Sequence, residues 1–401
     1  MSRPEEAENY AITGGRLANK FFILTCLISV CMNIGANTAN NSVALYLTHI
    51  DPVNGASLNG MIAIPFAITA IIARLVSGYF ADHLSRRTVL FWGLVLFAVS
   101  MLPFGMISSV VVLFILRGAQ GFAYSACNTT LSAATLDTSP PDKVSAASGF
   151  FYVPSALSIA LCGVIAVYFS GRGQYTLMFV VLGVSLAVGA VLSFLCNYEK
   201  LHSFRPDPSE VKTHRGIEEF IEPEALRPAA VAALSCVFSA FFNGFLLMYA
   251  QSIDMPHSGL FFTVAAVFML ILNLSAGKLQ QWIGRLPLVI ASLVLLGGSL
   301  ILLAVTGSFA AYVFAAIGYS TLCGSAFPAL YVIGLEKVRP ERRGAASCTL
   351  LVANDIGIGI GTPIWGVVVT ALGYTHSVAL CGIGFVVTAV LSLLILRQKK
   401  A

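Results

Sequence analysis

Charged residues are scarce in this sequence. Only 10% of its 401 residues are Asp, Glu, Lys or Arg, whereas 57% are hydrophobic, and the mean hydropathy is +0.86. A soluble domain cannot build a water-facing surface from so few charged side chains. The composition therefore excludes an ordinary soluble protein and places the chain in a lipid bilayer.

Motifs of common enzymes and pumps are also missing. The sequence has no H-E-x-x-H or G-x-S-x-G element, and it lacks the G-x-x-x-x-G-K loop that holds nucleotide phosphates. Its six histidines are scattered, and its nine cysteines form no C-x-x-C pair. We therefore expect no enzyme, no metal site and no cofactor.

The net charge of +5 does not indicate a nucleic-acid partner. The basic residues form short clusters at the ends of apolar stretches, rather than a stripe with interleaved aromatic residues. We therefore expect no nucleic acid among the partners.

Long apolar stretches dominate what is present, and a helix that crosses a bilayer needs about 20 such residues. Twelve stretches qualify, and they begin near Phe21, Ala56, Thr88, Val110, Ser148, Tyr175, Pro228, Gly259, Leu286, Phe309, Ala345 and Thr375. The longest polar interruption separates the first six from the last six. The sequence predicts an all-α integral membrane protein of two pseudo-symmetric six-helix bundles: tail 1–19, first bundle 20–197, linker 198–227 and second bundle 228–401.

An internal repeat supports this division. Gly277, Gln281 and Arg285 repeat the spacing and the position of Gly78, Asp82 and Arg86. At the same offset, Pro340-Glu341-Arg342 follows Pro141-Asp142-Lys143. Two copies of one membrane bundle are typical of transporters that rock one half against the other around a central site.

The distribution of the 23 Lys and Arg residues predicts the orientation. Arg172 lies alone in a loop on one side and Arg117 lies within a span, while the others fall in or beside the tails, the linker and the even-numbered loops. Cytoplasmic loops carry the excess of positive charge. We expect a multi-pass protein of the cell inner membrane with both termini in the cytoplasm, and the polar first 20 residues do not have the pattern of a cleavable signal peptide.

The segment from Gly78 to Arg87 resembles the signature loop between the second and third helices of the major facilitator superfamily. Ser85 stands where that family has Gly, and His83 stands where it usually has Arg or Lys. The resemblance extends over nearly the whole chain, through the twelve spans, the linker and the second copy of the loop. It implies a transporter that works by alternating access.

The loop motif predicts a gate on the cytoplasmic side. Asp82 can accept hydrogen bonds at the N-terminus of a facing helix, whose dipole favours negative charge, while Arg86 and Arg87 stay at the lipid headgroups. The alternative is that the basic residues only set the topology and that the acid-to-base spacings are solvated surface charges. The expected gate comprises Gly78, Asp82, Arg86, Arg87, Asp137, Lys143, Gly277, Gln281, Arg285, Glu336 and Arg342.

The fourth span contains Arg117-Gly118-Ala119-Gln120-Gly121, which resembles the Arg-x-x-Gln-Gly motif of proton-coupled antiporters. A cation inside a span is costly unless it faces a wet cavity or a partner, so Arg117 is a functional candidate. The alternative is a structural arginine that donates hydrogen bonds to carbonyls of a neighbouring helix.

The eleventh span holds Asp355, the one carboxylate that the sequence places near the middle of a span. A buried carboxylate is costly as an anion, so it can carry a proton or pair with a cation; a fixed structural carboxylate is the alternative. The glycines that follow it, together with Pro363, resemble the glycine-proline element of antiporters and of exporters of the drug-efflux and opine-efflux kind. In the fifth span, where the family carries this element, Ser158, Ala160 and Cys162 replace the glycines.

Polar side chains recur along two of the predicted spans. Asn33, Asn37 and Asn41 are spaced by four residues and share one helix face, with Asn40 beside them. Such amides need partners, which indicates either a wet central cavity or hydrogen bonds between helices. The candidate cavity residues are Asn33, Asn37, Asn41, Gln120, Tyr124, Asn128, Asn243, Tyr249, Tyr319, Tyr331 and Asn354.

Together these features predict a monomeric, proton-coupled secondary transporter of a small organic molecule, with coupling through Asp355 and Arg117. The resemblance in the fourth and eleventh spans favours export, and proton-coupled uptake of a nutrient or metabolite is the alternative. A non-transporting receptor is the alternative from another class, although we expect the short tails to leave it no signalling domain. The partners are the substrate, protons and the bilayer.

Overall fold

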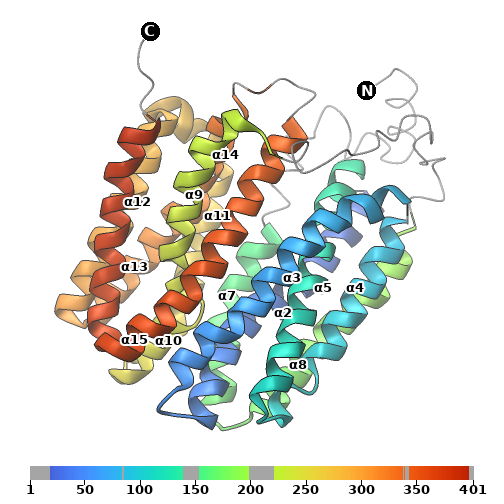
Figure 1. Ribbon diagram of the computed structural model, residues 1–401, viewed down its shortest axis with the longest axis horizontal. Helices are drawn as coiled ribbons and strands as arrows, with labels where there is room; N and C mark the ends of the chain where they lie inside the picture. Colours follow the sequence, from blue (N-terminus) through green and yellow to red (C-terminus); the bar gives the residue numbers. More distant parts are fainter. Residues whose placement is uncertain are drawn as a thin grey trace.

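The structure of the protein is a computed structural model. It describes residues 19–83, 85–138, 153–197, 221–336, 338 and 343–396, and within these ranges the side chains of residues 75, 77–83, 133, 136, 137, 343 and 344 are not described. Every regular element in these ranges is a helix. The helices are arranged as two bundles that lie side by side (Figure 1).

The first bundle is formed by six long helices and one short 3-10 turn. They are α2 (Lys20–Ile50), α3 (Gly55–His83), α4 (Arg86–Met101), η1 (Phe104–Met106), α5 (Val110–Asp137), α7 (Val153–Ser170) and α8 (Tyr175–Leu195). Tight turns join most of them, so consecutive helices run antiparallel.

The second bundle has two interrupted spans. Its elements are η5 (Pro223–Ala225), α9 (Leu226–Ser239), η6 (Ala240–Phe242), α10 (Phe245–Ser252), α11 (Leu260–Ile283), α12 (Arg285–Thr306), α13 (Phe309–Thr321), the π-helix η7 (Leu322–Ala326), α14 (Phe327–Leu335) and α15 (Arg343–Leu396).

The structure confirms the predicted membrane fold. Eleven helical stretches of the described chain are long and apolar enough to cross a bilayer. The last of these, Ala345–Leu396, is 52 residues long and contains two spans that meet at Gly373, where the backbone has a φ of 76°. The twelve spans of the sequence analysis are therefore present.

Local capping explains two of the helix starts. The Asn19 side chain accepts a hydrogen bond from the backbone N–H of Phe22 at 2.9 Å and begins α2. The Ser85 hydroxyl accepts one from the N–H of Thr88 at 3.2 Å and begins α4. Ser is among the best N-cap residues, so the departure from the family pattern at position 85 gives α4 a cap.

Each bundle has its own apolar core. In the first, Leu94 and Phe97 of α4 pack with Leu182 and Leu186 of α8. The core of the second bundle is richer in aromatic residues, and it continues across the boundary to residues of α2, α3 and α7. Those residues are Ala44, Leu45, Ala56, Cys162 and Ala166.

Small residues allow close backbone contact between the bundles at the end opposite the start of α2. An added Cβ on Gly60 of α3 would lie 3.0 Å from the Cα of Gly366 in α15. A second pair of helices also joins the bundles, since the Thr263 hydroxyl of α11 donates a hydrogen bond to the carbonyl of Ala160 in α7 at 2.9 Å. The two bundles are therefore closely packed at this end.

The seventh span is broken where it meets the first bundle. Gly244, between η6 and α10, has a φ of 98°, a conformation that side chains other than glycine rarely adopt. A Cβ there would also collide with Ala44 of α2. The break places Asn243 at the boundary between the bundles, opposite Asn59 of α3.

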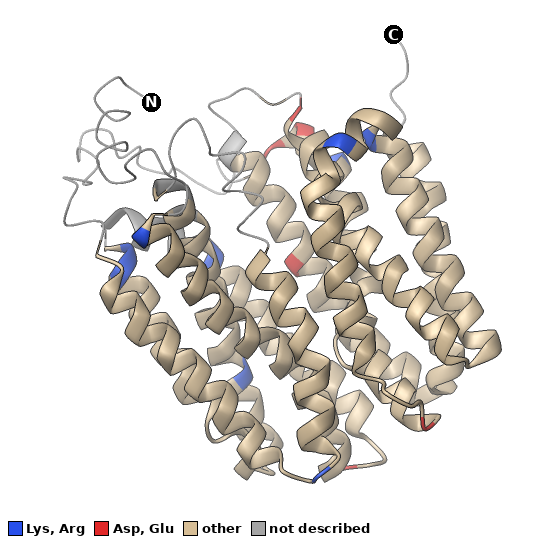
Figure 2. Ribbon diagram, turned by 180° about the vertical axis from the view of Figure 1, so that it is seen from behind, with Lys and Arg blue, Asp and Glu red and all other residues tan. Residues whose placement is uncertain are grey.

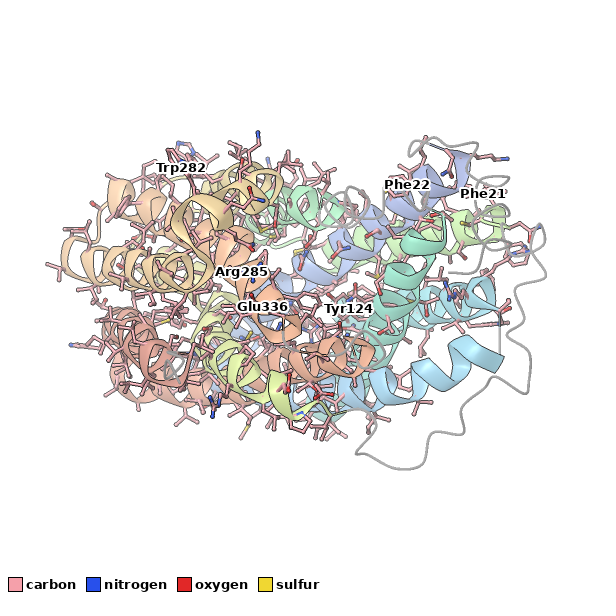
Figure 3. All side chains as sticks on the ribbon, turned by 90° about the horizontal axis from the view of Figure 1, so that it is seen from above. Phe21, Phe22, Tyr124, Trp282, Arg285 and Glu336 are labelled. Atoms are coloured by element: carbon pink, nitrogen blue, oxygen red, sulfur yellow. The ribbon has the colours of Figure 1, made fainter. Side chains whose placement is uncertain are left out.

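The charge distribution follows the expected pattern. Lys and Arg gather at the end of both bundles where α2 begins and α15 ends, and the middle of the helices carries few charges (Figure 2). At that end the exposed Trp282 lies in the last turn of α11 (Figure 3), as expected for an aromatic anchor at a membrane interface.

We expect Gly366→Val to lower the melting temperature of the protein, because overpacking a tight contact costs about 1–3 kcal/mol. Gly298→Val in α12 is the matched control, since no atom lies within 4 Å of an added Cβ there. Unfolding can be followed with a thiol-reactive dye, which would report on the buried cysteines Cys127, Cys162, Cys196, Cys236 and Cys381. Equal melting of the two variants would contradict the close packing of α3 and α15.

Candidate functional site

An ion pair joins the two bundles inside the membrane region. Nε of Arg74 in α3 donates to Oδ2 of Asp355 in α15 at 2.8 Å. The side chains are 8% and 22% exposed, respectively. Along the helices, this ion pair lies closer to the end where α2 begins and α15 ends than the contact between Gly60 and Gly366 does. Because it connects α3 to α15, any movement that separates these helices has to break it.

Arg74 was missed by the sequence analysis, which assigned it to the charges beside an even-numbered loop. In the structure it lies well inside α3, and its side chain is buried. The available signal was local: Arg74 has apolar residues on both sides, at Ile71, Ile72, Ala73, Leu75 and Val76. A basic residue within such a run must be paired or face a cavity.

Arg117 of α5 is held by neutral groups of the first bundle. Its Nη1 donates to Oε1 of Gln120 at 2.9 Å, and its Nη2 donates to Oδ1 of Asn40 in α2. The guanidinium carbon also lies 4.6 Å from the ring centre of Phe66, in a cation–π contact. Gln120 in turn donates to the carbonyl of Ser100 in α4 at 3.2 Å. This network ties four helices of the first bundle together.

A small cavity lies between the bundles beside Arg117. Its volume is about 50 Å³, and it is lined by Asn40, Asn59, Ile62, Ala63, Phe66, Ala67 and Arg117 of the first bundle and by Asn243, Ile358, Gly359 and Thr362 of the second. A water molecule needs about 10–15 Å³ by this measure, so the cavity has room for a few waters or one small polar group. Amides, one guanidinium and apolar side chains therefore meet at a single place.

The predicted amide face of α2 has partners of another kind. Asn33 donates to the carbonyl of Ser29 in its own helix at 2.8 Å. Asn37 donates to the hydroxyl of Ser158 in α7 at 2.6 Å, and Asn41 lies 3.7 Å from the sulfur of Cys162. These contacts match the alternative of hydrogen bonding within the bundle.

On α2 it is the neighbouring Asn40 that lines the cavity, and on α3 it is Asn59, which the sequence analysis did not single out. A spacing of four residues shows that side chains share one face of a helix, but it does not show whether that face packs against the second bundle.

The aromatic candidates are spread over the molecule. Tyr124 of α5 lies near the boundary between the bundles (Figure 3), with its ring centre 6.1 Å from that of Phe66. Tyr319 packs against Phe242 with ring centres 4.4 Å apart, beside the break in the seventh span.

Three candidates lie outside the cavity wall. Tyr249 is buried in the second core and donates to the carbonyl of Leu303 at 3.4 Å. Tyr331 bonds to Ser347 at 2.6 Å near the end with the termini. Asn128 is half-buried on α5.

Two polar residues of the second bundle do lie close to the features described above. Asn243 lines the cavity. Asn354, next to Asp355, has a buried Oδ1 without a hydrogen-bond partner among the described residues.

Part of the predicted gate lies in the described chain. Arg285, at the start of α12, pairs with Glu336 at the end of α14, with 2.8 Å between Nη1 and Oε2 (Figure 3). Arg87 contacts the end of α8, where its Nη1 donates to Asn197 at 3.3 Å and its guanidinium lies 4.2 Å from the ring centre of Phe194.

The remaining gate residues give little further evidence. Arg86 begins α4, Gly277 has no close neighbour at its Cβ position, and Gln281 is exposed on α11. Lys143 and Arg342 lie outside the described residues, as do the surroundings of Gly78 and the side chains of Asp82 and Asp137. The latch at Asp82 therefore stays a prediction.

Comparison with a protein-family model gives a match over most of the chain. The model of the Major Facilitator Superfamily matches residues 25–362 and, separately, residues 229–401. The second match lies within the second bundle, as expected for two copies of one unit. No curated protein sequence matches the chain.

Solved structures share this fold at low sequence identity. The nucleoside transporter NupG superimposes with a TM-score of 0.76 at 14% identity, over 95% of this chain and 100% of that one. A bacterial homologue of the human lysosomal transporter Spinster, described as inward-facing and occupied, gives 0.71 at 15% identity, over 96% and 100%. A point mutant of the peptide transporter POT in complex with sulfate gives 0.76 at 13% identity, over 97% and 98%.

We expect Arg74→Gln to destabilise the protein by about 3 kcal/mol, because it leaves a buried carboxylate without its partner. Adding Asp355→Asn should recover most of that loss, since both charges are then removed. The matched pair is Arg285→Gln with Glu336→Gln, whose side chains are 39% and 54% exposed; here the coupling should be about 0–1 kcal/mol. Melting of the single and double variants at pH 8 measures both couplings, and equal values would contradict a special role for the buried pair.

Proposed function

This chain belongs to the Major Facilitator Superfamily, and on that premise we propose that it is a proton-coupled secondary transporter that moves a small organic molecule by alternating access. The fold and the family support transport rather than enzymatic chemistry. The finer parts of the proposal, which are the coupling ion and the direction of transport, depend on the charged residues between the bundles.

The observation that carries proton coupling is the ion pair between Arg74 and Asp355. In alternating access, the two bundles tilt relative to each other and open one side at a time. An ion pair across their boundary stabilises the arrangement in which both charges meet. A proton on Asp355 removes its charge and weakens this connection, so the protonation state of one side chain biases the conformation.

The free energy of the ion pair between Arg74 and Asp355 is comparable to the free energy that coupling requires. Breaking a buried ion pair by removing one partner costs about 3–5 kcal/mol, and changing a two-state population from 1:99 to 99:1 requires about 5.5 kcal/mol. The pair therefore supplies a large part of the bias, and binding of the substrate in the cavity has to supply the remainder.

Arg117 takes the second role in this proposal. It lines the cavity together with Asn40, Asn59 and Asn243, and these side chains come from both bundles. A substrate that binds there contacts both halves of the molecule, which is the requirement for linking its binding to their relative tilt. The pair of Arg285 with Glu336 fastens α12 to α14 at the gate end of the second bundle.

We propose export from the cytoplasm across the cell inner membrane, with both termini cytoplasmic. The support for export is the resemblance of the segments around Arg117 and Asp355 to those of antiporters. The support for the orientation is the positive charge at the end where α2 begins and α15 ends (Figure 2). Export by exchange moves protons opposite to the substrate, whereas uptake by symport moves both in the same direction.

We expect Asp355→Asn to abolish substrate-driven proton movement in proteoliposomes with a pH dye inside, screened over organic cations, nucleosides, amino-acid derivatives and sugars. Amide replaces carboxylate without a large change of shape, so the variant can bind substrate but cannot exchange a proton. Glu224→Gln is the matched control, because it makes the same chemical change at an exposed carboxylate outside the proposed gate and cavity, and it should retain the flux.

Retained proton flux in the Asp355→Asn protein would refute the coupling role of this residue. The sign of the pH change distinguishes export by exchange from uptake by symport. Protons that move in the same direction as the substrate would identify uptake by symport.

A further inference from the structure

We propose that the substrate carries one carboxylate group, which binds to Arg117 in the cavity between the bundles. The inference rests on the transport function proposed above and specifies its substrate class. It depends on the charge balance, the hydrogen bonding and the walls of the cavity.

The charge balance of the membrane interior leaves Arg117 without a counter-ion. The deep charges of the described spans are Arg74, Asp355 and Arg117, and the first two neutralise each other. The groups that contact Arg117 are the amides of Asn40 and Gln120 and the ring of Phe66, which carry no net charge. No described carboxylate lies within 4 Å of its nitrogens. A buried cation without a counter-ion is costly in a membrane, so an anionic ligand stabilises the site.

Hydrogen bonding at Arg117 is also incomplete. The residue is 6% exposed, yet its Nε–H has no hydrogen-bond partner among the described residues. Nη1 and Nη2 each make one bond, to Gln120 and Asn40, and each can donate a second. The guanidinium edge formed by Nε and its neighbour suits the two oxygens of a carboxylate, and this bidentate geometry is the strongest that arginine makes.

The second bundle completes the site. Nδ2 of Asn59 reaches the carbonyl of Asn243 only at 3.4 Å, a long hydrogen bond that a carboxylate oxygen can replace. The cavity of about 50 Å³ accommodates a carboxylate group but no larger anion with its hydration shell. A carboxylate bound there accepts from Asn59 of the first bundle, and the wall that the second bundle supplies beside it includes Ile358, Gly359 and Thr362.

The walls determine what the rest of the substrate is. Apolar side chains of Ile62, Phe66 and Ile358 line the cavity beside Arg117 and the polar residues, so the atoms next to the carboxylate have apolar wall to pack against. A single arginine balances one negative charge and does not balance a phosphate dianion, while an organic cation is repelled. The class that this charge balance indicates is a small organic monocarboxylate, of which the cavity holds the carboxylate group itself.

The test compares carboxylates with their primary amides on the purified full chain. The pairs are butyrate and butyramide, benzoate and benzamide, nicotinate and nicotinamide, and N-acetylalanine and its amide. We expect at least one carboxylate to raise the melting temperature while its amide does not. Arg117→Gln should weaken that binding at least about ten-fold, because two charge-assisted hydrogen bonds are lost. Arg172→Gln, which alters an exposed arginine in a loop, should bind as the parent protein does.

Two measurements separate binding from a merely structural role. Without ligand, Arg117→Gln should melt close to the temperature of the parent protein, because removal of a buried uncompensated charge offsets the loss of the bonds to Asn40 and Gln120; a purely structural arginine would give clearly lower melting. Arg117→Lys keeps the charge and tests the site even where the glutamine variant does not fold. It should bind the carboxylate at least about three-fold more weakly, because lysine cannot offer two parallel N–H groups.

The inference is overturned if amides stabilise the protein as well as carboxylates, if none of the four carboxylates stabilises it, or if the Arg117 variants bind as the parent does. Proton flux in proteoliposomes distinguishes this failure from that of the proposed function. A carboxylate that binds through Arg117 but moves no protons contradicts only the proton coupling. Flux driven by a neutral or cationic solute, and retained in Arg117→Gln, contradicts only the substrate class.

Discussion

A charge inside a bilayer must have a partner, because no water is available to solvate it. In this protein Arg74 and Asp355 meet the requirement for each other, and the two members of this ion pair come from different bundles. The pair can form only where α3 and α15 run close together over much of their length. Because the pair neutralises both of its members, it leaves Arg117 as the deep charge of the described spans without a counter-ion.

Glycine makes the approach of α3 and α15 possible. Gly60 faces Gly366 and Gly359 faces Ala67, so the two backbones come close without intervening side chains. Such small residues are the usual means of helix association in lipid, where the hydrophobic effect between helices is absent. Within each bundle the core is instead filled by large side chains, such as Phe97 and Leu186 in the first and Phe241 and Phe385 in the second.

The two halves repeat in their loops but not in their deep charges. At the offset that relates Gly78 to Gly277, Arg74 corresponds to Asn273, Arg117 to Ala316 and Asp355 to Ala156. The loop motif is thus present in two copies of the sequence, whereas each deep charge is present in one. This asymmetry puts both arginines on one side of the boundary and the carboxylate on the other. As a result, the ion pair of Asp355 connects the two bundles rather than two helices of one bundle.

The sequence by itself determined the membrane fold, its twelve spans and the repeat of the loop motif, because lipid requires long apolar helices and each of these features is a local pattern. It also identified Arg117 and Asp355, since a charge in an apolar run is visible without a structure. Only the tertiary structure decided that Asp355 pairs with Arg74, and that Asn40 faces the cavity while Asn37 bonds to α7. The packing of segments far apart in sequence decides how a helix is rotated about its axis and which helices it contacts. The residue pattern within one helix does not carry this information.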